Sequence, residues 1–132
     1  MTRLALVLTL AGLLGGMDQV PLIANQGLDI PKDEIASKKI EALSGSGIAA
    51  FQLYNYYDVV LLNRGESLYW VTISAENDYP SGMYALGFRL AGLNDTQSRT
   101  RARYWLEKAE KNGEPLARDI LKQLETPSSG KK

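Results

Sequence analysis

The amino-acid sequence predicts an all-α fold, a right-handed solenoid of stacked helix hairpins with about two and a half repeats. The first observation behind this prediction is that identical residue types recur 35 residues apart, and the pairs are Trp70 and Trp105, Asn77 and Asn112, Pro80 and Pro115, Gly47 and Gly82, and Ala50 and Ala85. A period of this length is typical of proteins in which a two-helix unit buries its apolar face by stacking on neighbours. The second observation is that apolar residues between the Gly, Pro and Asn breaks have helical spacing.

The breaks between these segments give the expected helices in order. Pro31, Pro80 and Pro115 suit the first position of a helix, and Ser46 and either Asp95 or Thr96 suit the N-cap. Gly45 and Gly113 suit the residue that follows a helix. The expected helices are 31–43, 47–63, 66–76, 80–91, 96–112 and 115–124.

The second expected helix, 47–63, is apolar on most of its circumference, which is typical of a helix that is buried on two flanks. On a continuous helical wheel, Asp58 shares one strip with Gly47, Phe51, Tyr54 and Leu61. Leu61 is therefore expected to face inward, and Asp58 to be partly buried.

The chain divides into four regions. Residues 1–16 place one Arg before an apolar run that is too short to span a bilayer, as in a signal peptide. An extended leader is expected over 17–30, the helical repeat domain over 31–125 and a disordered tail over 126–132. The signal cleavage site is left open, and the mature protein is expected to be periplasmic.

The composition excludes several classes of chemistry. The chain has no Cys and no His, which excludes thiol nucleophiles, imidazole bases, disulfides and ordinary zinc sites. Lys and Arg together number 15, as do Asp and Glu, so no net charge favours nucleic acid or an anionic membrane. We expect no cofactor, no metal, no nucleic-acid partner and no membrane span in the mature protein.

Two motifs within the repeat carry a family resemblance. They are Asp78-x-Pro80-x-Gly82-x-x-x-Leu86-Gly87-x-x-Leu90 and Ala102-x-x-Trp105-x-x-Lys108-Ala109-x-x-x-Gly113. These motifs resemble the Sel-like repeat, a helical solenoid family related to tetratricopeptide repeats. The resemblance extends over residues 44–124, and it departs from the family pattern in the loop 92–95 and at Leu90, where Tyr is usual.

The repeated residues have a packing interpretation. Gly47, Gly82 and Ala117 fall where two helices are expected to approach closely, and Trp70 and Trp105 are expected to fill the space between paired helices. A structural role is therefore expected for them in preference to a functional one.

Four residues are candidates for contact with a partner: Tyr56, Asp58, Tyr84 and Arg89. The two tyrosines are expected to point away from the strip of small residues, and Tyr is common at binding hot spots. Arg89 takes the repeat position of Tyr54, where a cation either contacts a partner or covers an apolar face. Asp58 either pairs with Arg89 or Arg64 or acts as a catalytic carboxylate, and the pairing is the favoured interpretation.

These observations favour a non-catalytic protein-binding module with no catalytic residue. Small exported proteins with such repeats resemble immunity proteins, which implies binding to a toxic antibacterial effector, for example a phospholipase delivered by a type VI secretion system. One alternative is a periplasmic or cytoplasmic scaffold that assembles an envelope or signalling complex. The less favoured alternative is a small glycosidase that uses Asp58 and a second carboxylate.

Overall fold

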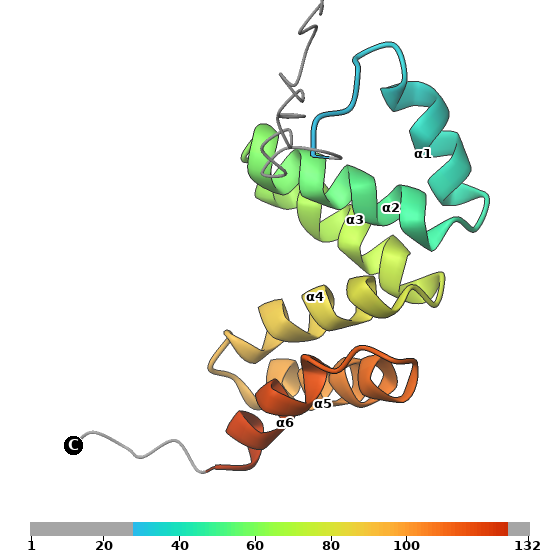
Figure 1. Ribbon diagram of the computed structural model, residues 1–132. Helices are drawn as coiled ribbons and strands as arrows, with labels where there is room; N and C mark the ends of the chain where they lie inside the picture. The colour runs from blue at the N-terminus through green and yellow to red at the C-terminus, as the bar shows by residue number, and fades with distance from the viewer. Residues whose placement is uncertain (1–27, 127–132) are drawn as a thin grey trace, which may run out of the picture.

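A computed structural model describes residues 28–126, and this part of the chain contains helices and turns with no β-strand (Figure 1). The elements are α1 (Ile35–Leu43), α2 (Gly47–Asn55), the π-helix η2 (Tyr56–Val60), α3 (Arg64–Glu76), α4 (Pro80–Ala91), α5 (Thr96–Lys111) and α6 (Ala117–Glu125). The all-α prediction is therefore confirmed for the described residues. The expected signal peptide at 1–16, most of the leader at 17–30 and the tail from 127 onward lie outside them.

The helices follow one another from one end of the molecule to the other in chain order (Figure 1). Each helix packs against the next one along the chain, and further contacts join α1 to α3, α2 to α4, and α4 to α6. Packing therefore connects elements that are close in sequence, as is common in proteins built from short helical units.

Two glycines allow the helices to approach closely. A Cβ atom on Gly47 would lie 2.6 Å from the Cβ of Tyr79, and one on Gly82 would lie 2.7 Å from the Cβ of Ser74. Ser74, which is fully buried, also donates a hydrogen bond of 2.8 Å to the carbonyl oxygen of Gly47. The close approach predicted at these two glycines is confirmed, and Ala117 is fully buried as well.

The core consists of two clusters, one around each tryptophan. Trp70 belongs to the cluster formed mainly by α1, α2 and η2, whereas Trp105 belongs to the cluster formed by α3 to α6. Both tryptophans are buried, in agreement with the packing role expected from the repeat. The helix α3 contributes to both clusters, because Val71 packs in the Trp105 cluster.

The predicted starts of α2 and α5 are confirmed by the hydrogen bonds at their caps. The Ser46 hydroxyl accepts from the Ala49 N–H at 3.1 Å, and the Asp95 carboxylate accepts from the Ser98 N–H at 2.8 Å. Gly45 and Gly113 have φ values of 112° and 93°, which is the left-handed region expected after a helix. Asp95, not Thr96, is thus the N-cap of α5.

The second expected helix does not run to residue 63. Its α-helical part ends at Asn55 and continues as η2, where the Leu61 N–H donates to the Tyr56 carbonyl oxygen five residues earlier at 3.1 Å. The wider π turn changes the direction of the side chains that follow it, relative to a continuous α-helix. Leu61 is consequently 50% exposed, so the prediction that it faces inward is wrong.

Two prolines open turns and not helices. Pro31 is followed by a turn before α1 begins at Ile35, and Pro115 is followed by a turn before α6 begins at Ala117. The sequence also predicts that Leu116 faces inward in the last helix, but this residue lies in the turn and is exposed.

Candidate functional site

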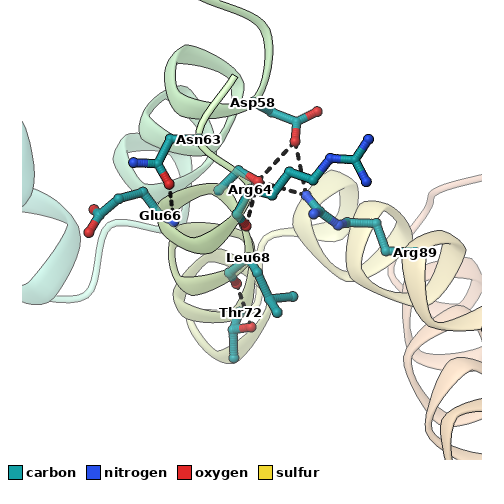
Figure 2. A network of polar contacts seen from close by, with 8 residues as sticks. Asp58, Asn63, Arg64, Glu66, Leu68, Thr72 and Arg89 are labelled. Carbon is teal, nitrogen blue, oxygen red and sulfur yellow. Dashed lines mark hydrogen bonds and ion pairs between the residues drawn. The ribbon is translucent and has the colours of Figure 1, made fainter. Parts of the chain in front are cut away.

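The predicted residues Asp58 and Arg89 meet where η2, the first turns of α3 and the last turn of α4 come together (Figure 2). Arg89 Nη1 lies 3.1 Å from Asp58 Oδ1 and 2.9 Å from Ser67 Oγ. Ser67 Oγ in turn lies 2.9 Å from the same carboxylate oxygen. The favoured interpretation of Asp58, that it pairs with a nearby arginine, is confirmed.

Local structure positions each member of this network. The π turn places Asp58 opposite α3, the Asn63 side chain caps α3 by accepting from the Glu66 N–H at 3.1 Å, and Ser67 follows in the first turns of that helix. Arg89 lies in the last turn of α4, where a cation interacts favourably with the negative end of the helix dipole.

The network is partly shielded from solvent. Ser67 is fully buried, whereas the side chains of Asp58 and Arg89 are 35% and 26% exposed. Among the residues that the structure describes, every buried side-chain nitrogen and oxygen has a hydrogen-bond partner. The three polar groups therefore satisfy one another, and they join two helix hairpins.

Tyr54 lies beside this network on α2. The guanidinium carbon of Arg89 lies 6.0 Å from the centroid of the Tyr54 ring, within the range of a cation–π contact. Burial of the Tyr54 phenol, and then the charge of Asp58, raise its pKa above the ordinary value of 10.0, although Arg89 opposes the shift. The phenol therefore stays neutral to a higher pH than an ordinary tyrosine.

An open groove of about 450 Å³ lies next to the network, and its lining residues are Tyr54, Asp58, Leu62, Arg64, Phe88 and Arg89. A second hollow, of about 320 Å³, lies between α4 and α6 and shares Phe88 and Arg89 with the first. The two hollows together extend from the end of α2 and η2, past the last turn of α4, to α6.

The two predicted tyrosines differ in burial. Tyr56 is only 5% exposed and packs in the Trp70 cluster, so the prediction that it lies on a binding surface is wrong. Tyr84 is half-buried against the Trp105 cluster, and its ring centroid lies 6.1 Å from that of Phe88. Neither tyrosine lines the groove.

Sequence reasoning missed Leu62 and Phe88 as surface residues of this site and considered Arg64 only as a partner for Asp58. Leu62 has a φ of 51°, which is unusual for a residue with a bulky side chain, and it is 77% exposed. No local pattern marks it, because its exposure depends on the π turn that precedes it.

The groove can offer apolar surface and guanidinium donors to a ligand. Its lining includes one carboxylate, Asp58, whose Oδ1 atom already contacts Arg89 and Ser67. Within residues 28–126 no group of three or more acidic residues is placed to hold a metal ion. In the same range no helix is both long enough and apolar enough to cross a bilayer.

Comparison with known proteins finds one weak similarity. The chain is 29% identical over 100 residues to the protein named "Uncharacterized protein YibG" of Escherichia coli (strain K12), and the match covers 73% of the chain. It spans 65% of the length of that relative. No protein-family model and no solved structure matches the chain.

Proposed function

We propose that this protein is a non-catalytic protein-binding module. The observation that carries the proposal is the exposed apolar surface beside the groove. Val59, Val60, Leu61 and Leu62 are four consecutive aliphatic residues that are all exposed, and the last of them lines the groove together with the exposed Phe88. Contiguous apolar surface with a polar rim is typical of interaction sites.

The proposed architecture is a right-handed Sel-like solenoid of about two and a half repeats. Equivalent side chains of α3 and α5 support it: the rings of Tyr69 and Trp70 lie 4.9 Å apart at 83°, and those of Tyr104 and Trp105 lie 5.0 Å apart at 77°. The same edge-to-face pair thus occurs once in each return helix of the proposed repeat.

The biological role that we propose is that of an exported immunity protein in the periplasm. Its support is the signal-like sequence at 1–16, the resemblance to Sel-like repeats and a surface suited to binding. In this role the protein binds a toxic effector, for example a phospholipase delivered by a type VI secretion system, and blocks access to its active site without turnover.

The experiment is to express the full chain in the periplasm together with toxin candidates encoded next to its gene. Growth rescue together with isolation of a stable complex is the expected result. Rescue by none of the neighbouring toxins, with no complex by size-exclusion chromatography, would contradict the immunity role.

A scaffold role is the second proposal, and a separate surface favours it. Ile40, Leu43 and Ile48 are large apolar side chains that are exposed on α1 and at the start of α2, and none of them lines the groove. A scaffold needs two such surfaces to hold two partners together. If the protein is a scaffold, two different partner proteins should be recovered in one complex with the full chain.

A further inference from the structure

We infer that the groove between η2, α3 and α4 binds a peptide segment of the partner that carries an acidic side chain next to a large apolar one. This inference rests on the proposed protein-binding function and names the chemistry that the site would recognise. Arg64 is the charge contact, and Leu62 and Phe88 are the apolar contacts.

The charges of the groove provide the first argument. Three of the lining residues are charged, and Asp58 and Arg89 are paired at 3.1 Å. Arg64 is exposed and has no salt bridge within residues 28–126. The groove therefore has an excess of one positive charge, which complements a carboxylate.

The direction of the side chains provides the second argument. In Figure 2 the Arg64 side chain extends on the side of α3 that faces Asp58 and Arg89, whereas Glu66 lies on the opposite side. The Glu66 carboxylate accepts a hydrogen bond of 3.1 Å from the indole nitrogen of Trp70. The nearest acidic residue of α3 is thus directed away from the groove, and it leaves the charge of Arg64 available.

The backbone at Leu62 provides the third argument. A leucine with a φ of 51° adopts a conformation that glycine or asparagine adopts more easily, yet its side chain is 77% exposed. Little intramolecular packing compensates for this strain. Backbone strain of this kind is concentrated at functional sites, and here it places an aliphatic side chain at the edge of a groove that contains two arginines.

The test uses the full chain to select from a displayed library of random peptides. The wild type is expected to enrich Asp or Glu adjacent to Leu, Ile, Phe or Trp, and Arg64→Gln is expected to lose the acidic preference. Arg101→Gln is the matched control, because Arg101 is exposed on α5, stacks on Tyr104 at 4.9 Å and does not line the groove.

Calorimetry on one selected peptide then measures the charge contact directly. Replacing the acidic residue of the peptide by its amide is expected to weaken binding to the wild type and to Arg101→Gln about fivefold, and to leave binding to Arg64→Gln unchanged. Leu62→Ser is expected to weaken binding of both peptides to a similar extent. Circular dichroism confirms that each variant is folded.

Several results would overturn the inference. In the peptide selection, these results are the absence of any selected peptide, the absence of an acidic preference, and an acidic preference that persists in Arg64→Gln. The inference would also be overturned if Leu62 were needed for the chain to float with phosphatidylglycerol vesicles or to associate with itself. If an effector complex forms but is unaffected by Arg64→Gln and Leu62→Ser, this inference fails while the proposed function stands. If the peptide results hold and no effector binds, the immunity role fails and the groove assignment stands.

Discussion

Asp58 and Arg89 form a salt bridge of 3.1 Å although they lie on different helix hairpins, 31 residues apart in the chain. Because both side chains are partly exposed, we expect their coupling to contribute about 0.5–1 kcal/mol to the free energy of unfolding. A double-mutant cycle with Asp58→Ala and Arg89→Ala, followed by urea denaturation, measures this coupling. It should decrease at high salt concentration, and a coupling of zero would show that the pair makes no contribution in solution.

Gly82→Ala should destabilise the protein, because Gly82 lies at the close contact between α3 and α4. In Gly82→Ala the added Cβ would lie 2.7 Å from the Ser74 Cβ and 3.0 Å from the Ser74 carbonyl carbon, so rotation of a side chain cannot relieve the clash. We expect α3 and α4 to separate slightly, at a cost of roughly 1–3 kcal/mol in the free energy of unfolding.

The matched control for this substitution is Gly65→Ala in the first turn of α3. The nearest atom to a Cβ at Gly65 would be Asn63 Oδ1 at 3.7 Å, which is an ordinary contact. Since alanine favours helix more than glycine by up to about 1 kcal/mol, this variant should be as stable as the wild type or more stable. Equal effects of the two substitutions on the melting temperature would contradict the close approach at Gly82.

Leu62→Gly should stabilise the protein and weaken its binding. Glycine adopts a positive φ without the steric cost that a leucine incurs, about 1–2 kcal/mol, and the exposed Leu62 side chain contributes little packing. A rise in the urea midpoint together with weaker binding of an acidic peptide is expected. A fall in stability would show that Leu62 makes packing contacts that its exposure does not indicate.

The Tyr54 phenol should titrate at higher pH than an ordinary tyrosine, whose pKa is 10.0. Burial raises its pKa above the ordinary value of 10.0, so its contribution to stability is fully present below pH 10 and is lost as pH rises through the folded-state pKa. Ultraviolet titration of the tyrosinate absorbance measures the difference. Tyr54→Phe should reduce the tyrosinate absorbance change above pH 10 more than below it, and an equal reduction on both sides would contradict the raised pKa.

The sequence was informative about features that depend on a few neighbouring residues. The caps at Ser46 and Asp95 and the left-handed glycines at 45 and 113 were predictable because their signals are local. The close contact at Gly82 was predictable because the repeat places small residues at equivalent positions.

The candidate site was only partly predictable. The pairing of Asp58 with an arginine followed from placing a carboxylate on a largely apolar helix. In contrast, Leu61 was assigned from a continuous helical wheel, which the π turn at Tyr56–Val60 interrupts. Tyr56 itself still follows the α-helical geometry of α2, and it is buried because the Trp70 cluster packs around it. Whether five successive residues adopt a π turn depends on tertiary packing, and therefore the exposed apolar surface after it could not be foreseen.

The membership of α3 in both core clusters has a consequence for the order in which the molecule opens. The terminal helices α1 and α6 each lie at one edge of one cluster, so either can fray while the remainder stays folded. Loss of α3 would expose both tryptophans together. Amide hydrogen exchange should consequently be fastest in α1 and α6 and slowest in α3, and the segment after η2 would be anchored by the most persistent helix of the chain.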